Sequence, residues 1–295
     1  MPPTENRTAG ILWMLATMVG FIALDTVMKY SLQIYSLVEV TWARFFFASI
    51  FAAIACGRNL PQLAISHMPK VQLMRSVFLM TTTGLFNAGI RTVPLATGTT
   101  IMFMSPILVT LLSIVVLGEH VGIRRWAGII FGFIGALIVI RVWDTGVIGL
   151  NTGVFFLLAA ALSNASYQIS TRRLRNDSPY TSLLFTAAVG ALVTSFLLPW
   201  HWSTPDAFGW LLLVGSGLVG CLSHLCLIKA LQAAPASVVA PFSYSSLIWA
   251  TSMGFIIWGD IPQASTLVGA ALIIGSGLYI FLREKTRATI PHSDT

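Results

Sequence analysis

The chain alternates between long apolar runs and short polar connections over almost its whole length. An α-helix needs about 20 apolar residues to cross a bilayer, and ten runs come close to this length. They are Ala9 to Met28, Val38 to Cys56, Val71 to Ile90, Leu95 to Leu117, Ile123 to Ile140, Gly149 to Ile169, Tyr180 to Leu198, Phe208 to Ile228, Ser237 to Trp258 and Ser265 to Leu282. The pattern predicts an all-α integral membrane protein with ten transmembrane helices.

The composition agrees with this reading. Hydrophobic residues make up 56% of the 295 residues and charged residues only 9%, whereas a soluble domain usually carries about 25% charged residues. The connections between runs are typically under about ten residues, too short to fold as a soluble catalytic domain. The net charge of +7 does not indicate nucleic-acid binding here, because in a membrane protein the distribution of Lys and Arg matters more than their sum.

The basic residues collect on one side of the predicted membrane. Lys and Arg near helix ends resist transfer across a membrane, so they mark the cytoplasmic side. With the N-terminus inside, that side holds Arg7, Arg58, Lys70, Arg75, Arg124, Arg125, Arg172, Arg173, Arg175, Lys229, Arg283, Lys285 and Arg287, and the outer side Lys29, Arg91 and Arg141. We therefore expect a multi-pass protein of the cell inner membrane with cytoplasmic N- and C-termini.

The second half of the chain repeats the first. At a shift of 141 residues, Pro94, Thr110, Gly118, Gly128 and Leu137 align with Pro235, Thr251, Gly259, Gly269 and Leu278, and Glu119 aligns with Asp260. We place a first five-helix repeat at residues 9–141, a second at 149–283 and a cytoplasmic tail at 284–295. Because five is an odd number, the second repeat enters the membrane from the opposite face. Inverted repeats around a central cavity are typical of transporters that work by alternating access.

Several short motifs point to a known family. The second run contains the pair Arg44-Phe45, Pro94 and Pro235 precede the fourth and ninth runs, and a Gly-acid turn follows each of those runs. Together with ten helices in two inverted halves, this resembles the EamA-type carriers of the drug/metabolite transporter superfamily. Within that group the chain is similar to YddG-like exporters of aromatic and other amino acids. The second half has no Arg-Phe pair, since its seventh run reads Phe185-Thr186-Ala187.

Polar residues form stripes at helical spacing within the apolar runs. Steps of three and four place such residues on one side of a helix. A stripe of this kind either hydrogen-bonds a neighbouring helix or lines a cavity, and for the stripes together we favour a cavity. The predicted substrate-binding residues are Met80, Thr83, Asn87, Met102, Ser105, Asn164, Tyr167, His224, Ser237 and Tyr244.

Few ionisable residues lie within the runs, and each needs a partner, water or an interfacial position. Asp25 and Lys29 are four residues apart near the outer end of the first helix, either as a structural pair or as a gating or proton-coupling site. Arg44 either gates or anchors the helix by reaching the outer surface. His224 either binds substrate or makes a helix contact. This scarcity of charge argues against multiply charged substrates, for which two or more buried bases facing the centre are expected.

Two prolines lie inside apolar runs. Pro106 and Pro241 each remove a backbone donor, and such prolines usually kink a helix. The freed carbonyl oxygens of Met102 and Ser237, four residues earlier, then face either a substrate or water; a simple bend that shapes the bundle is the alternative.

These observations predict a secondary transporter rather than an enzyme. It exports small metabolites, most plausibly aromatic and other apolar amino acids, and its partners are this substrate and the lipid bilayer. An exporter of drugs, nucleosides or other metabolites is the alternative within the same superfamily, and a membrane-embedded lipid-modifying enzyme is the alternative of another class. No nucleotide-binding, nucleophile or metal-ligand motif is present, so no cofactor and no metal is expected. Nothing indicates an oligomer, and a monomer fits.

Overall fold

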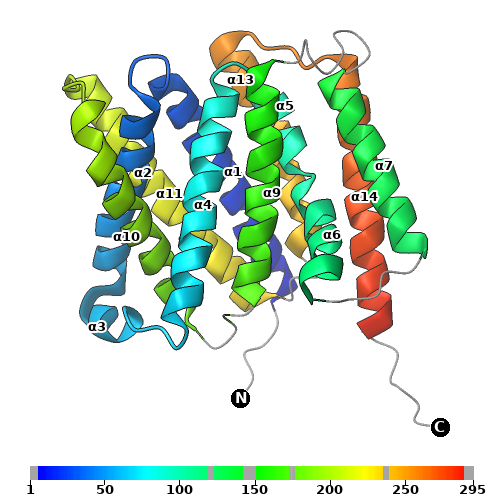
Figure 1. Ribbon diagram of the computed structural model, residues 1–295, viewed down its shortest axis with the longest axis horizontal. Helices are drawn as coiled ribbons and strands as arrows, with labels where there is room; N and C mark the ends of the chain where they lie inside the picture. Colours follow the sequence, from blue (N-terminus) through cyan, green and yellow to red (C-terminus); the bar gives the residue numbers. More distant parts are fainter. Residues whose placement is uncertain are drawn as a thin grey trace.

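The computed structural model describes residues 6–117, 123–141, 151–172, 174, 177–234 and 239–288. The described elements are all helical (Figure 1). The first half comprises α1 (Arg7–Ser31), α2 (Leu37–Cys56), η1 (Gly57–Asn59), α3 (Leu60–Leu63), α4 (Pro69–Ile90), α5 (Leu95–Met102), α6 (Ser105–Leu117) and α7 (Ile123–Ile140). The second comprises α9 (Thr152–Arg172), α10 (Pro179–Leu197), η2 (Leu198–Trp200), α11 (Ala207–Ala233), η3 (Ala240–Ser245), α13 (Ser246–Trp258) and α14 (Ala264–Ala288).

Local chemistry sets the ends of these helices. The side chains of Asn6, Ser36, Ser178 and Asp206 accept hydrogen bonds from the first backbone N–H groups of α1, α2, α10 and α11, which otherwise have no partner inside the helix. Helix α13 ends at Gly259, whose φ of 70° lies in the left-handed region. Only glycine adopts that conformation without steric cost.

The fourth and ninth apolar runs are each split into two helices. In the fourth run, α5 ends at Met102 and α6 begins at Ser105, so Pro106 lies in the first turn of a new helix. A proline is tolerated there because the first turn has no intrahelical partner for its missing N–H. In the ninth run Pro241 belongs to the 3₁₀ helix η3, which α13 follows. Both prolines therefore mark interruptions of a membrane crossing rather than bends within one continuous helix.

The helices pack in a pattern that is symmetric between the two halves. In this symmetry α1 is equivalent to α9, α2 to α10, α4 to α11 and α6 to α13. The contact of α1 with α11 thus repeats that of α9 with α4, the contact of α2 with α11 repeats that of α10 with α4, and the contact of α1 with α13 repeats that of α9 with α6. Two further pairs join equivalent helices, α2 with α10 and α7 with α14, and α5 packs against α13. Helices α1 and α9, the first of each half, begin at opposite ends of the bundle (Figure 1). The fold is therefore the predicted pair of inverted five-helix repeats.

Glycines permit the closest contacts between the helices. A Cβ atom at Gly10 would lie 2.5 Å from the Ala234 Cβ on α11, and one at Gly153 would lie 2.8 Å from the Gly89 carbonyl oxygen on α4. These two glycines occupy equivalent places in the two repeats. Between α7 and α14, a Cβ at Gly269 would lie 2.5 Å from the carbonyl oxygen of Gly135. Small residues are the usual way to bring helices together in lipid, where the hydrophobic effect does not drive association.

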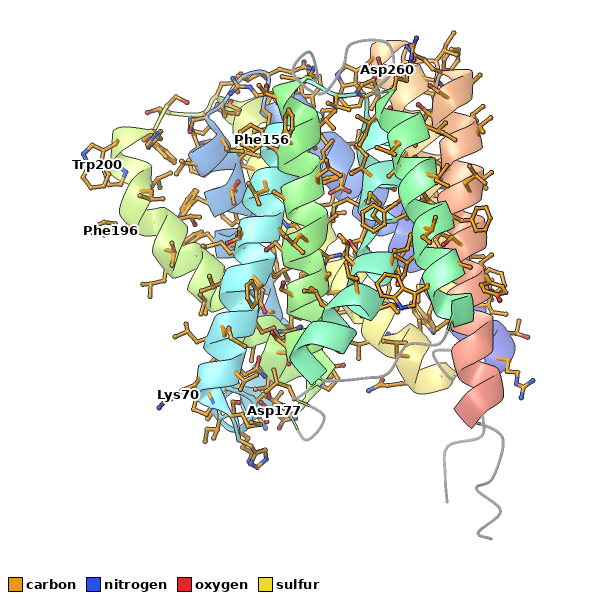
Figure 2. All side chains as sticks on the ribbon, turned by 45° about the vertical axis from the view of Figure 1, so that its right-hand side comes forward. Lys70, Phe156, Asp177, Phe196, Trp200 and Asp260 are labelled. Atoms are coloured by element: carbon orange, nitrogen blue, oxygen red, sulfur yellow. The ribbon has the colours of Figure 1, made fainter. Side chains whose placement is uncertain are left out.

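The outer surface of the bundle is apolar, as lipid requires. Six of the described helical segments are long and apolar enough to cross a membrane: Arg7–Ser31, Leu37–Leu63, Leu95–Leu112, Thr152–Thr171, Pro179–Trp200 and Ala207–Ala233. Phe196 and Trp200 are 74% and 70% exposed and project outward from the bundle (Figure 2). The protein is therefore a multi-pass membrane protein.

Candidate functional site

A cavity of about 620 Å³ lies at the centre of the bundle. We call it the central chamber. Its walls come from both halves, including α1, α4, α5, α9, α11, η3 and α14. The lining residues are Met18, Phe21, Ile22, Asp25, Arg44, Leu79, Thr82, Thr83, Phe86, Thr99, Met102, Phe103, Ser105, Pro106, Asn164, Tyr167, Gln168, His224, Leu227, Ser243, Tyr244, Ser246, Gly277 and Leu278. About half of these residues are apolar or aromatic, and the others carry hydroxyl, amide, imidazole or charged groups.

A second cavity of about 380 Å³ adjoins the first. We call it the end chamber, because it extends between α2, α4, α9, α10 and α11 to Asp177 and Pro179, in the connection from α9 to α10. Five residues line both chambers: Arg44, Leu79, Tyr167, His224 and Leu227. The two chambers are therefore adjacent and share part of their walls, and the end chamber lies toward one end of the bundle. Figure 2 shows Asp177 at that end and Asp260 at the opposite end.

At the opposite end Lys29 joins three segments. Its Nζ donates to the carbonyl oxygen of Val93 at 3.0 Å, lies 3.7 Å from Asp260 Oδ2 and lies 4.9 Å from the centre of the Trp258 ring. Lys29 is only 8% exposed. The acid that pairs with Lys29 is thus Asp260 of the second repeat and not Asp25, four residues away in the same helix.

Asp25 and Arg44 bring opposite charges to the central chamber. Both residues line it, and no direct ion pair joins them in the described part of the chain. The Arg44 guanidinium lies 3.7 Å from the Met28 sulfur and 5.8 Å from the centre of the Phe45 ring, and neither neighbour neutralises it. Arg44 lines both chambers, so its position differs from that of an anchor reaching the outer surface.

Arg75 is a second cationic residue of the cavity that sequence reasoning missed. The charge pattern places it among the residues of the cytoplasmic boundary, and in the structure it is 6% exposed and lines the end chamber. Arg75 and Arg44 both line the end chamber, whereas Arg44 also lines the central chamber and Arg75 does not. The available signal was its spacing, since Arg75, Leu79, Thr82 and Phe86 follow one another at steps of three and four and all line the cavity.

The predicted stripe on α4 lies partly on the wrong face. Thr83 lines the central chamber, whereas Met80 and Asn87 are not among the lining residues. Asn87 is fully buried, and its Nδ2 donates to Thr41 Oγ1 of α2 at 3.2 Å. Ser76, four residues before Met80 and on the same face of the helix, is satisfied within α4, because its hydroxyl donates to the carbonyl oxygen of Gln72 at 2.7 Å. The cavity-lining face is turned by one residue from the predicted one.

Most of the other predicted substrate-binding residues do meet at the central chamber. Met102, Ser105, Asn164, Tyr167, His224 and Tyr244 line it, as does Pro106. Ser237 lies outside the described residues, and so does the side chain of Pro241. Among the residues that the structure describes, no three His, Cys, Asp or Glu side chains gather as a metal site would require.

Several neutral groups of the chamber are held in place by the helices themselves. Asn164 Nδ2 donates to Ser105 Oγ at 3.1 Å. His224 Nδ1 lies 2.9 Å from the carbonyl oxygen of Gly220, and because a carbonyl only accepts, this nitrogen carries the proton in neutral histidine. The other ring nitrogen, Nε2, is then an acceptor with no partner among the described residues. The ring of Phe21 meets the His224 ring edge-on at 4.9 Å.

Asp177 lies in the wall of the end chamber, and its carboxylate is hydrogen-bonded by neighbouring residues of the protein. It accepts hydrogen bonds from Ser66 Oγ, from the His67 backbone N–H at 3.0 Å and from Gln72 Nε2 at 2.9 Å. Burial tends to raise the pKa of Asp177, but the hydrogen bonds outweigh this effect and hold the pKa below its ordinary value of 3.8. Asp177 is therefore ionised near neutral pH and already supplied with donors.

Comparison with known proteins gives this architecture a family. A model of the EamA-like transporter family matches residues 8–141 and again residues 151–282. The S-adenosylmethionine uptake transporter of Rickettsia conorii is 28% identical to the chain over 293 residues, which are 98% of this chain and 97% of that protein. The riboflavin transporter of Vibrio cholerae is 29% identical over 283 residues, 92% of each protein.

Two further similarities are more limited. The pseudopaline exporter of Pseudomonas aeruginosa is 29% identical over 192 residues, which cover 62% of this chain and 64% of that protein. A solved crystal structure shares 19% identity with the chain, covers 96% of it and superposes with a TM-score of 0.59, which supports the fold alone. Since the family model accounts for both repeats and the named relatives are transporters of small molecules, the chain belongs to the EamA-like transporter family.

Proposed function

We propose that the protein is a secondary transporter of amino acids and related metabolites that carry both a carboxylate and an ammonium group. It exports them across the cell inner membrane, with its N- and C-termini in the cytoplasm. Aromatic and other apolar side chains are the preferred ones. Direction follows the gradient, so the same protein also supports exchange between the two sides.

The observation that carries this proposal is the arrangement of Asp25 and Arg44. Both face the central chamber, one acidic and one basic, and neither has an ion-pair partner among the described residues. Buried charges in a membrane are costly unless compensated. An amino acid supplies the missing partners, because its ammonium group pairs with Asp25 and its carboxylate with Arg44. Arginine suits this role, since its planar guanidinium binds a carboxylate through two hydrogen bonds.

The rest of the chamber suits an apolar side chain. Phe21, Phe86, Met102, Phe103 and Tyr244 form much of its wall. Phe103 and Tyr244 meet edge-on at 5.1 Å, an orientation that aromatic pairs favour. The volume of about 620 Å³ falls within the range of about 300–1,000 Å³ usual for small-molecule sites.

The two ends of the cavity support alternating access. The space continues through the end chamber toward Asp177, while Lys29 joins Val93, Trp258 and Asp260 at the other end. The interrupted crossings α5/α6 and η3/α13 contact each other through α5 and α13, and broken helices of this kind form the substrate sites of transporters with inverted repeats. This arrangement supports a carrier in which the cavity extends toward the proposed cytoplasmic side while the other end is closed.

The relatives widen the substrate panel that needs testing. S-adenosylmethionine, named for the relative in Rickettsia conorii, contains a carboxylate and an ammonium group as well as a sulfonium. Riboflavin, named for the relative in Vibrio cholerae, has neither of these two groups. Transport of S-adenosylmethionine but not riboflavin fits a site built on Asp25 and Arg44.

Counterflow in liposomes that contain the purified protein tests the proposal. Vesicles preloaded with unlabelled phenylalanine or leucine are expected to accumulate the labelled compound transiently, and empty vesicles are not. Asp25→Asn is expected to weaken this accumulation while leaving the protein folded. Absence of flux across a panel of amino acids, amines, nucleosides, riboflavin and S-adenosylmethionine would rule out the proposed transport, and flux of riboflavin or nucleosides alone would rule out the substrate class.

A further inference from the structure

Arg75 is a buried base whose hydrogen-bond partners are all neutral. Its Nε donates to Thr171 Oγ1 at 2.8 Å, its Nη1 to the Ser182 carbonyl oxygen at 3.1 Å and to Thr186 Oγ1 at 3.0 Å, and its Nη2 to the Tyr167 hydroxyl at 2.6 Å. The guanidinium also lies 4.5 Å from the centre of the Tyr167 ring. Arginine has five N–H donors, so one on Nη2 has no partner among the described residues.

The acid of the end chamber does not neutralise Arg75. Asp177 accepts from Ser66, His67 and Gln72 and forms no ion pair with Arg75 in the described part of the chain. Gln72 connects the surroundings of the two residues, because its Nε2, which donates to Asp177, also lies 3.0 Å from Ser182 Oγ. The positive charge of Arg75 is therefore held in place by neutral dipoles and left without an opposite charge.

An uncompensated charge within a membrane needs an anion or water. The wall of the end chamber around Arg75 includes the apolar residues Leu79, Leu183, Leu227 and Ile228 beside its polar and charged groups. A cationic group next to these apolar side chains fits a carboxylate attached to an apolar body. The desolvation cost of the buried Arg75 charge is offset when such a ligand supplies the opposite charge and an acceptor for the remaining N–H of Nη2.

We propose that Arg75 forms a second carboxylate-binding site in the end chamber, distinct from the one at Arg44. The transported amino acid occupies it between the central chamber and the end of the bundle at Asp177. The identity of the ligand rests on the proposed function. Both arginines line the end chamber, and Tyr167 lines both chambers while its hydroxyl accepts from Arg75. The carboxylate can thus pass from one guanidinium to the other without leaving the cavity.

Site-directed alkylation separates the two sites. Cys56, Cys221 and Cys226 are replaced by alanine, and a single cysteine is introduced either as Leu183→Cys in the end chamber or as Met102→Cys in the central chamber. N-ethylmaleimide then reports occupancy of each place, with phenylalanine or phenethylamine, which lacks the carboxylate, as the probe. At a phenylalanine concentration roughly ten times its Kd, occupancy slows alkylation by about tenfold.

Phenylalanine is expected to protect both cysteines, and phenethylamine is expected to leave Leu183→Cys unprotected. Adding Arg75→Gln should abolish protection at position 183 and retain it at position 102. The exposed Arg58→Gln, which makes the same change at a residue that lines neither chamber, serves as the matched control and should alter neither. Equal protection of position 183 by phenylalanine and phenethylamine, or protection that survives Arg75→Gln, would overturn the second site.

Two further comparisons keep the result interpretable. Protection at neither position in the protein with both arginines would contradict the proposed function itself, which distinguishes the two failures. If Arg75→Gln does not yield a monodisperse protein, the phenylalanine and phenethylamine comparison with Arg75 in place still decides the matter. Arg75→Lys keeps the charge but not the fixed geometry of the donors, and it should retain partial protection at position 183.

Discussion

Lys29 and Arg75 are both buried bases within the membrane region, but their surroundings differ. Lys29 meets Asp260, the Val93 carbonyl and the Trp258 ring, so the protein itself supplies the opposite charge from its other half. Arg75 meets only neutral acceptors and an aromatic ring. The first arrangement connects two repeats, and the second leaves a charge to be compensated by a ligand.

Asp260 and Asp25 differ in the same way as the two bases, since one is paired within the protein and the other has no ion-pair partner among the described residues. Asp260 pairs with Lys29 at the end of the bundle opposite Asp177 (Figure 2), whereas Asp25 faces the central chamber and makes no hydrogen bond within the described residues. Because a buried charge must be paired somewhere, the unpaired charges lie where we propose that the substrate binds. The charged pair that the protein completes by itself marks where the cavity is closed.

The largest expected effect comes from removing an unpaired base. Arg44→Gln should lower counterflow of labelled phenylalanine by about tenfold to hundredfold, since a hydrogen bond to a charged group contributes about 1.5–3 kcal/mol. Its folded yield should remain close to that of the wild type. Arg58→Gln, at an exposed position, is the control and should transport normally. Unchanged transport by Arg44→Gln would remove this residue from the substrate site.

Removing Lys29, the base that is paired within the protein, should affect the conformation of the bundle more than it affects substrate binding. Lys29→Gln is expected to open the end of the bundle at Asp260. An impermeant thiol reagent applied from that side should then label Met102→Cys, in the chain without native cysteines, about fivefold faster. This factor corresponds to about 1 kcal/mol, a modest value because Asp260 is 31% exposed. The double variant Lys29→Asp with Asp260→Lys, which exchanges the two charges, should restore slow labelling. If this double variant is labelled as fast as Lys29→Gln, the pair does not hold this end closed.

Neutral lining residues should matter less than the charged ones. His224→Ala and Tyr244→Ala are each expected to lower transport by about threefold, as for one neutral hydrogen bond of roughly 0.5–1 kcal/mol, and to lower the folded yield less. Counterflow and gel filtration of the same preparations measure the two quantities. Wild-type transport rates and substrate preference in both variants would exclude these side chains from the site.

The smallest effect concerns Asp177, an acid held by neutral donors outside the membrane-spanning helices. Its folded pKa lies below the ordinary value of 3.8, so its contribution to stability is present above that pH and is lost as the pH falls through the folded pKa. Asp177→Asn should lower the unfolding temperature at pH 7 by about 2 °C, a small shift because the site is partly exposed. The difference should shrink as the pH falls below 3.8, and a constant difference across that range would contradict the assignment.

Much of the architecture follows from the sequence alone. The spacing of apolar runs and the alignment of Gly128 with Gly269 and of Glu119 with Asp260 are enough to predict a duplicated, ten-crossing membrane protein. They suffice because membrane thickness sets the length of a crossing and because turns and close helix contacts admit few residue types. The interruptions at Pro106 and Pro241 were predictable as perturbations of the helices, though not as complete breaks.

Only the tertiary structure decided which face of each helix meets the cavity. On α4 the hydroxyl of Ser76 bonds to its own helix and Asn87 bonds to α2, while Arg75 turns into the end chamber. A helix within a membrane bundle has apolar residues on all sides, so polarity does not reveal which side faces a cavity, and Ser or Thr needs no cavity to satisfy its hydroxyl. Likewise, Lys29 finds its acid in Asp260, 231 residues away along the chain, because charge pairing depends on distance in space and not on the interval in sequence.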